Sequence, residues 1–217
     1  MQKKFLFIIA VIFSWYELAT AGEWEEISRA GGVMVWKKEI PGSDFIAFKG
    51  RMLMDLPISK VASVLLNEDI AQKKRWIDRV DKFEVLSRDD VKGVSVTYSS
   101  YSLPFPIADR DFVIQATKVV NKGAGIKLRM RSVKHPRFPD SKSAGVRGLV
   151  MGSSFELLPR GAKTDVIVTI QSDPKGMLPA WLVNLINKSW PYNTLQAIAK
   201  EGKAAEKHAE TLQVFAH

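Results

Sequence analysis

The sequence of 217 residues has the length of a single domain, and its 46% hydrophobic and 25% charged residues are ordinary for a globular protein. It has no cysteine, which excludes disulfides, thiol catalysis and lipoprotein acylation. The net charge of +9 favours anionic surfaces such as phospholipid headgroups, although a well-solvated basic surface explains it equally well. Because the basic residues are spread along the chain, we expect no nucleic-acid partner.

The N-terminal segment has the pattern of a secretory signal peptide. Two lysines precede an uncharged apolar run from Phe5 to Phe13, which is too short for a bilayer span of about 20 residues. Ala19-Thr20-Ala21 then supplies a small-x-small cleavage site. We therefore expect residues 1–21 to be removed and a single mature domain at 22–217 to be exported, in a bacterium to the periplasm. The alternatives are an uncleaved anchor or a buried N-terminal strand.

The mature chain begins with strands and a helical segment. Two strands are expected at 32–38 and 45–56. In the second strand, apolar residues at even positions from Ile46 to Met54 alternate with charged ones, which is typical of a half-buried strand. Residues 57–77 are expected to be helical, because proline suits a first helical turn and an apolar stripe follows it.

Further strands follow in three predicted hairpins with short connections, so the sheet should be largely antiparallel. The pairs are 83–88 with 95–102, 111–121 with 126–133, and 146–158 with 164–173.

A final helix is expected from Pro179 to about residue 210, a length of roughly 45 Å, with Gly202 marking a frayed or bent distal part. One helix cannot cover both faces of so many strands. The predicted fold is therefore α+β, a helix-grip fold in which a curved, mostly antiparallel sheet wraps the C-terminal helix. The pattern is equally compatible with a filled core and with a ligand cavity between sheet and helix.

Catalytic chemistry is not indicated by any motif. The three histidines have no metal-ligand spacing, and no nucleophile elbow, phosphate loop or dinucleotide fingerprint is present. Asp109-Arg110-Asp111 is interpreted as a local salt bridge that pins a loop to the next strand. Lys127, Arg129 and Arg131 alternate along one strand and indicate a solvent-facing side, the alternative being an arginine that receives a headgroup. We predict no catalytic residue, no metal and no cofactor.

The loop at 102–108 is the most informative connection. It places Phe105 and Ile107 beside prolines, as expected for an apolar lid at a cavity mouth that can touch a membrane. The alternative is that both side chains simply close the core.

Four local runs resemble the START lipid-transfer domains of the helix-grip (SRPBCC) superfamily, in the same order along nearly the whole mature chain. They are Gly32-Val33-x-Val35, Pro106-x-x-x-Arg110-Asp111-Phe112-Val113, Val146-Arg147-Gly148, and Asp173-Pro174-Lys175-Gly176-x-Leu178-Pro179-x-Trp181-Leu182-Val183-Asn184. The resemblance implies that one lipid lies in a tunnel between sheet and helix, that the 103–108 loop and the last helix gate its entry, and that the protein is a carrier and not a catalyst.

One position departs from the sterol-binding members of that family. Ala116 stands where they carry a buried arginine, and the paired acid is replaced by Thr97 or Tyr98, although Lys118 is near. We therefore expect a more neutral tunnel, in which the hydroxyls of Tyr98, Ser153 or Ser189 orient the ligand.

The predicted function is binding and transfer of a lipid or other hydrophobic small molecule, with transient contact with an anionic membrane. The alternatives are a helix-grip enzyme of the cyclase or hydrolase type, which acts on an apolar substrate, and a structural domain with a filled core. The residues expected to contact the ligand are Tyr98, Phe105, Ile107, Ile114, Ala116, Leu128, Met130, Met151, Leu182, Leu185, Ile186 and Ser189.

Overall fold

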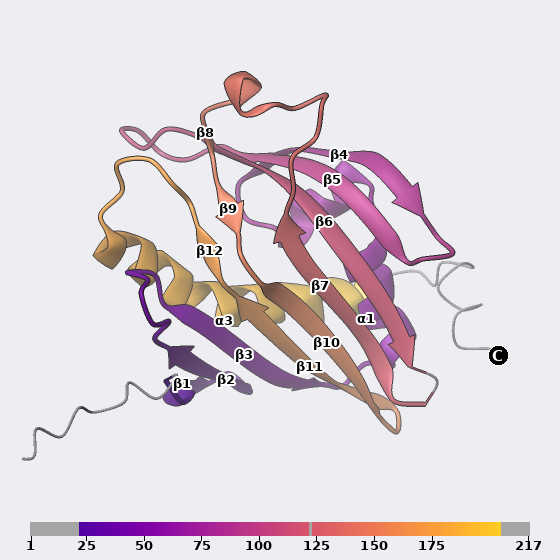
Figure 1. Cartoon of the computed structure of the whole chain (residues 1–217). Coiled ribbons are helices and arrows are strands. Elements are labelled where there is room, and N and C mark those ends of the chain that lie inside the picture. The colour runs from indigo at the N-terminus through magenta and orange to yellow at the C-terminus, as the bar shows by residue number, and fades with distance from the viewer. Residues whose placement is uncertain (1–21, 122, 205–217) are drawn as a thin grey trace, which may run out of the picture.

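A curved sheet wraps around one long helix in the computed structural model, which describes residues 22–121 and 123–204 (Figure 1). The proposed signal peptide and the expected last turns of the final helix lie outside these residues. The helices are α1 (Ile58–Leu66), α2 (Ile70–Trp76) and α3 (Ala180–Ala204), and a short 3₁₀ turn spans Asp140–Lys142. The predicted fold class, α+β with a helix-grip arrangement, is confirmed.

Nine strands follow one another across the main sheet, each antiparallel to its neighbours, and a tenth joins it off this path. Their spatial order is β1 (Glu25–Ala30), β2 (Val33–Lys38), β3 (Ala47–Met54), β11 (Lys163–Ile170), β10 (Ser153–Arg160), β7 (Gly125–Ser132), β6 (Arg110–Asn121), β5 (Val94–Tyr101) and β4 (Val80–Asp89). The tenth strand, β8 (Val146–Arg147), runs parallel to β6, and β9 (Leu149–Val150) pairs with β12 (Ser172–Asp173) in a separate ribbon.

Two predicted elements are interrupted. The helix expected at 57–77 is a pair, because the chain leaves the helical conformation at Asn67 and the Asp69 side chain caps α2 by accepting a hydrogen bond from the backbone of Gln72. The strand expected at 146–158 is broken into β8, β9 and β10. Gly148 lies against the ring of Phe112, where an added Cβ would come within 2.3 Å, so the chain passes close to β6 before it turns away.

Helix α3 packs tightly on the sheet because β3 carries a glycine beneath it. A Cβ on Gly50 would lie 2.7 Å from the Cβ of Pro191 and 3.0 Å from a methyl group of Leu195. Gly202 makes a similar close approach to Leu56 and is buried within α3, whereas the distal part that it is expected to mark lies outside the described residues. These contacts hold the length of α3 against one part of the sheet.

The strand register identifies which side chains face α3. Gly50 lies opposite Val168, Val168 opposite Phe155, Phe155 opposite Leu128 and Leu128 opposite Lys118. Directly opposed residues share a face of the sheet. The face that contacts α3, called the concave face below, therefore continues across the sheet from Gly50 to Lys118.

The three helices cover only part of the concave face. Helix α3 contacts β2, β3 and β11, α1 contacts β10 and β11, and α2 contacts β4. Extensive helix contacts to β5, β6 and β7 are absent from the described part of the chain. The buried core accordingly centres on α1, α3 and the strands beneath them.

Enlarging Gly50 should weaken this helix packing. We expect Gly50→Val to lower the free energy of unfolding by about 1–3 kcal/mol, as measured by urea denaturation, because the new methyl groups would overlap Pro191 and Leu195. Thr169→Val, on the opposite face of neighbouring β11, is the matched control and should change the stability little. Equal stability of the two variants would contradict this account of the packing.

Candidate functional site

The concave faces of β5, β6 and β7, called the wall below, lie on the side of the sheet that α3 contacts further along. Ile114 and Ala116 on β6 lie opposite Thr97 and Ser95 on β5, and Ala116 also lies opposite Met130 on β7. Although these five side chains face the helix side of the sheet, all remain partly accessible. Deeper in the same wall, Leu128 is buried and belongs to the main core. The wall is therefore apolar in its centre and hydroxylated along β5.

Helix α3 carries a row of partly accessible apolar side chains along one of its sides. The ring of Trp190 lies 6.4 Å from that of Phe155 on the concave face of β10. Ile186 lies one turn before Trp190 on the same side of the helix and is 50% exposed, and Leu182 lies a further turn before it and is half-buried. Leu185 and Ser189 are exposed, and the Ser189 hydroxyl donates a hydrogen bond to the carbonyl of Ile186.

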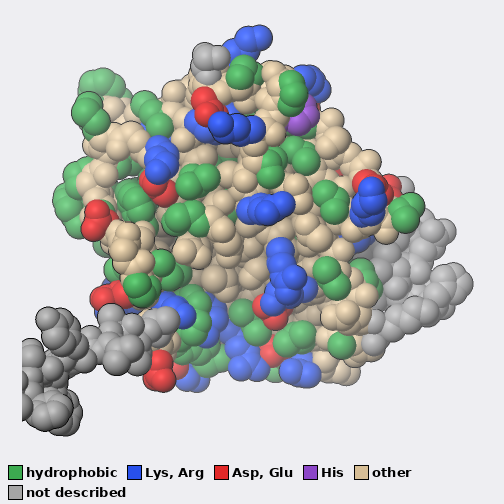
Figure 2. Space-filling model, viewed as in Figure 1, with side chains coloured by type: hydrophobic (Ala, Val, Ile, Leu, Met, Phe, Trp, Pro, Cys, Tyr) green, Lys and Arg blue, Asp and Glu red, His purple; other side chains and the backbone are tan. Residues whose placement is uncertain are grey.

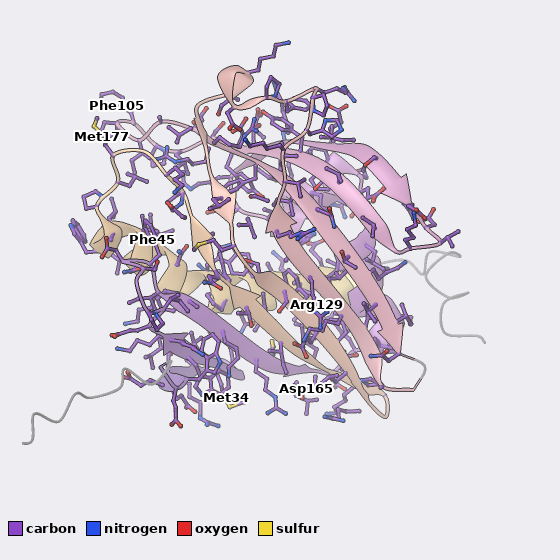
Figure 3. The ribbon with its side chains drawn as sticks, in the orientation of Figure 1. Met34, Phe45, Phe105, Arg129, Asp165 and Met177 are labelled. Carbon is purple, nitrogen blue, oxygen red and sulfur yellow. The ribbon has the colours of Figure 1, made fainter. Side chains whose placement is uncertain are left out.

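Exposed apolar side chains gather where the 102–109 loop meets the start of α3. Phe105 is 97% exposed, and Met177 and Trp181 are also exposed. Figure 2 shows hydrophobic side chains concentrated on this side of the molecule, and Figure 3 places Phe105 and Met177 at the tips of their loops. Ile107 is half-buried behind them. We call Phe105, Met177, Trp181, Leu185 and Ile186 the mouth patch.

A buried arginine joins the two segments that carry this patch. The Arg110 guanidinium donates hydrogen bonds to the carbonyls of Ala108, in the loop, and of Pro174 (2.7 Å) and Lys175 (3.1 Å), in the segment that leads to α3. Burial lowers the pKa of Arg110, but the guanidinium stays charged because arginine is the most basic side chain. The adjacent Asp109 carboxylate accepts a hydrogen bond from the backbone of Leu103 and closes the loop on itself.

A second buried cation supports α1 and α2. The Lys73 ammonium donates a hydrogen bond of 2.9 Å to the carbonyl of Leu65 at the end of α1, and it lies about 5 Å from the ring centroids of Trp76 and Phe83. Burial lowers the pKa of Lys73 to about 8. These contacts assign Lys73 to a structural role at a helix C-terminus, where a cation is favourable.

Comparison with known proteins identifies the fold and the family together. The START domain family matches residues 17–203. The chain belongs to the START domain family. An uncharacterized protein of Pseudomonas aeruginosa is 26% identical over 92% of this chain and 95% of its own length. Human START domain-containing protein 10 is 32% identical over 88% of this chain, which spans 64% of that protein.

A solved structure and a lipid transfer protein are also similar to this chain. The crystal structure of human STARD10 superimposes with a TM-score of 0.75 at 27% identity, covering 90% of this chain and 78% of that one. The bovine phosphatidylcholine transfer protein is 25% identical over 82% of this chain and 83% of its own length.

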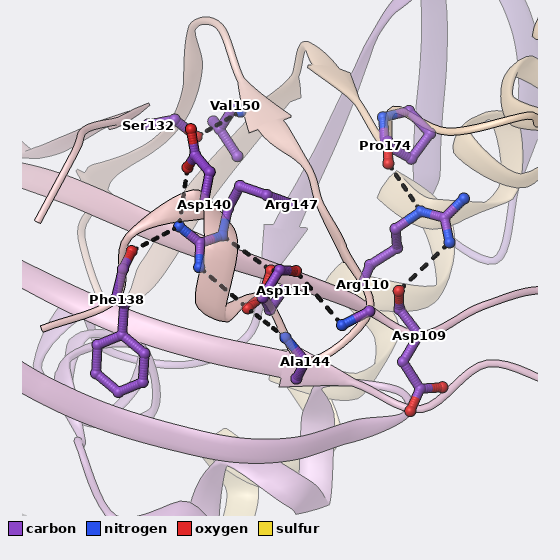
Figure 4. A network of polar contacts seen from close by, with 12 residues as sticks. Asp109, Arg110, Asp111, Ser132, Phe138, Asp140, Ala144, Arg147, Val150 and Pro174 are labelled. Atoms are coloured by element: carbon purple, nitrogen blue, oxygen red, sulfur yellow. Dashed lines mark hydrogen bonds and ion pairs between the residues drawn. The ribbon is translucent and has the colours of Figure 1, made fainter.

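A polar network on the convex face of this START domain holds the 134–145 segment (Figure 4). The Asp111 carboxylate, which is fully buried, accepts hydrogen bonds from Arg147, from the Ser143 hydroxyl and from the backbone of Ala144. Arg147 also donates to the carbonyl of Phe138. The predicted pinning role of the Asp109–Asp111 run is thus present, but Asp111 pairs with Arg147 and not with Arg110.

Tyr98 is the predicted ligand contact that the structure moves away from the others. It lies opposite Val113, one residue out of phase with Ile114, and its ring stacks on Phe138 with centroids 3.9 Å apart. Burial and the charge of Asp111 raise its pKa to about 12. Tyr98 therefore belongs to the convex network, and Thr97 takes the concave position.

The remaining hydroxyls predicted to orient a ligand are already engaged. Ser153 lies on the concave face, but its oxygen accepts a hydrogen bond from the backbone of Gln171, and Ser189 bonds within α3. Met151 lies in the turn before β10, where its backbone donates to Gln171. The sequence analysis missed Ser95, which the alternation along Val94–Tyr101 would have placed with Thr97.

Two negative findings apply to residues 22–121 and 123–204. They contain no group of three or more histidine or carboxylate residues able to hold a metal ion. Within the same ranges, every helix is too short or too polar to serve as a membrane span.

The buried Asp111 should make stability depend on acid pH. Burial raises the pKa of its carboxyl, but the hydrogen bonds from Arg147, Ser143 and Ala144 outweigh burial and hold the pKa below its ordinary value. A depressed pKa in the folded state stabilises the fold above about pH 4, the unfolded pKa, and this stabilisation is lost as pH falls through the folded pKa. Urea unfolding followed from neutral to acid pH should show this loss.

Asp111→Asn tests the assignment. Removing one partner of a buried ion pair should cost about 3–5 kcal/mol at neutral pH and should flatten the acid dependence. Asp140→Asn is the control. Asp140 also pairs with Arg147, at 3.4 Å, but it is exposed, so its replacement should change stability by less than about 1 kcal/mol. An acid dependence that survives in Asp111→Asn would refute the assignment.

Proposed function

We propose that this START domain binds one lipid in the space between α3 and the concave faces of β5–β7, and carries it between membranes. The observation that carries the proposal is that β6 and β7 direct the partly accessible Ile114, Ala116 and Met130 to the concave face, where extensive helix contacts are absent from the described part of the chain. The family membership and the similarity to a phosphatidylcholine transfer protein support a lipid as the occupant.

We propose that the domain carries its lipid and does not catalyse a reaction on it. The side chains that β5, β6 and β7 direct to the concave face include no histidine and no carboxylate. General acid–base catalysis most often uses such groups, held within hydrogen-bond reach of the substrate. The wall therefore suits binding, in which burial of the acyl chains contributes about 25 cal/mol per Å² of apolar surface.

Entry and release are proposed to occur at the mouth patch. Exposed aromatic and aliphatic side chains in one cluster are favourable at a membrane surface and unfavourable in water. Contact with a bilayer would bury the patch, loosen the loop and the start of α3, and let a lipid pass without crossing water. The net positive charge of the chain favours an anionic bilayer for this step.

Export to a bacterial periplasm, after removal of residues 1–21, completes the proposal. Its support is the basic start, the short apolar run and the Ala19-Thr20-Ala21 site in the sequence.

Native mass spectrometry of the full-length gene product purified from its host tests both parts. We expect a protein mass that corresponds to a chain beginning at Gly22, with an additional mass that collision releases as a lipid. Denaturing mass spectrometry of the same sample is the control for covalent modification. A bare protein that also takes up no lipid from vesicles would overturn the carrier function, and an uncut chain would overturn export.

The mouth patch can be tested separately. Phe105→Ala combined with Met177→Ala should reduce binding to anionic phosphatidylglycerol vesicles about tenfold or more in co-sedimentation, because inserting a large apolar side chain is worth about 1.5–3 kcal/mol. Val91→Ala is the matched control, since Val91 is 99% exposed but lies in the β4–β5 turn at the opposite end of β5. Equal losses in both variants would argue against a specific mouth.

A further inference from the structure

Lys118 stands on the same face of the sheet as the residues that pack under α3. It is the last member of the cross-strand row that starts at Gly50 and includes Phe155 and Leu128. Gly50 contacts α3 through Pro191, and Phe155 lies near Trp190 on the helix. The Lys118 side chain therefore leaves the sheet on the side of the proposed lipid space.

The Lys118 ammonium has no partner in the part of the chain that the structure describes. Three other cations on or near this side are satisfied: Arg110 by four carbonyls, Lys73 by Leu65 and two rings, and Arg88 by Glu68 and Asp90. The neighbours of Lys118 on its own face are apolar, with Leu128 opposite and Ala116 two residues before it. A charge beside apolar groups is costly unless an opposite charge or a polar partner compensates it.

Two hydroxyls without a partner in the described ranges lie on the same face, Ser95 diagonally beside Lys118 and Thr97 two residues further along β5. Ser95 is directly opposite Ala116, and Thr97 is opposite Ile114. Cross-strand Cβ atoms on one face lie about 5 Å apart, and residues i and i+2 on one strand about 7 Å apart. Ser95 and Lys118 therefore flank Ala116 on two sides, and the small side chain of Ala116 leaves room between them.

We propose that Lys118, with the hydroxyl of Ser95, binds an anionic oxygen group of the lipid, a carboxylate or a phosphate, over Ala116. This inference rests on the proposed lipid-carrier function and names the chemical class of its ligand. An ammonium and a hydroxyl are both hydrogen-bond donors to such a group, and hydrogen bonds to charged oxygens are the stronger ones. Thr97 extends the donor row toward Ile114 and suits a second oxygen of the same group.

The inference replaces the neutral tunnel expected from the sequence. That expectation relied on Tyr98, Ser153 and Ser189, of which the first faces the convex side and the other two have partners within the protein. Ala116 replaces the arginine of the sterol-binding members. Lys118 places a different cation two residues further along the same strand, on the same face.

Binding of three fluorescent probes to delipidated full domain (residues 22–217) tests the inference. The probes are a labelled oleate, a labelled phosphatidic acid and a labelled diacylglycerol with the same acyl chains as the phosphatidic acid. We expect wild-type protein to bind at least one anionic probe more tightly than the diacylglycerol. Lys118→Met should weaken that binding about tenfold or more while leaving the diacylglycerol unchanged, and Lys118→Arg should restore most of it.

The controls separate charge, fold and surface effects. Lys127→Met removes a lysine from the convex face of adjacent β7, where it pairs with Glu156, and should bind all three probes as the wild type does. Ser95→Ala should weaken the same anionic probe by a smaller factor. Preference for oleate over phosphatidic acid, or the reverse, identifies a carboxylate or a phosphate as the group bound.

Two results would overturn the inference. One is equal binding of diacylglycerol and the anionic probes by wild-type protein, and the other is unchanged anionic binding in Lys118→Met, as expected if the ammonium reaches solvent beside the β4–β5 turn. In both cases lipid is still bound, so the carrier function stands. Failure of the wild type to bind any probe, together with a bare native mass, would instead remove the carrier function itself.

Discussion

The close contact between α3 and β3 is the constraint on which the rest of this START domain depends. Because Gly50 has no side chain, Pro191 and Leu195 rest almost on the sheet backbone, and α3 is drawn to the β2–β3–β11 part of the sheet. One helix held there cannot also cover β5–β7. The space that we assign to a lipid therefore follows from how tightly the helix packs elsewhere, and not from loose packing of the protein as a whole.

Two neighbouring residues at the start of β6 stabilise segments on opposite faces of the sheet. Arg110 points to the concave side and joins the mouth loop to the lead-in of α3, whereas Asp111 points to the convex side and holds Arg147 and the 134–145 segment. Because successive side chains of a strand point to opposite faces, Arg110 and Asp111 hold the 102–109 loop on one face and the 134–145 segment on the other. Each group makes several hydrogen bonds, as a buried charge requires.

Much of the fold could be predicted from the sequence, because alternation and turn residues are local signals. The faces of 45–56 and 126–133, the short hairpins and the single long helix all follow from such signals. The assignment of Tyr98 to the ligand could not be tested without the register that pairs it with Val113. Likewise, the break of 146–158 depends on Phe112, a residue distant in the sequence. The site was harder to predict because its residues come together across neighbouring strands, and the strand register is not visible in the sequence.

The four carbonyls bound to Arg110 also limit how the 102–109 loop and the segment before α3 can move in the proposed entry step. Ala108 belongs to the 102–109 loop, and Pro174 and Lys175 belong to the segment before α3. Arg110 fastens both segments to the same strand, β6. Displacement of either segment alone would break hydrogen bonds of the buried Arg110 guanidinium and strain the other segment. In the proposed entry step, the apolar tips would therefore move while the bases of both segments stay hydrogen-bonded to β6.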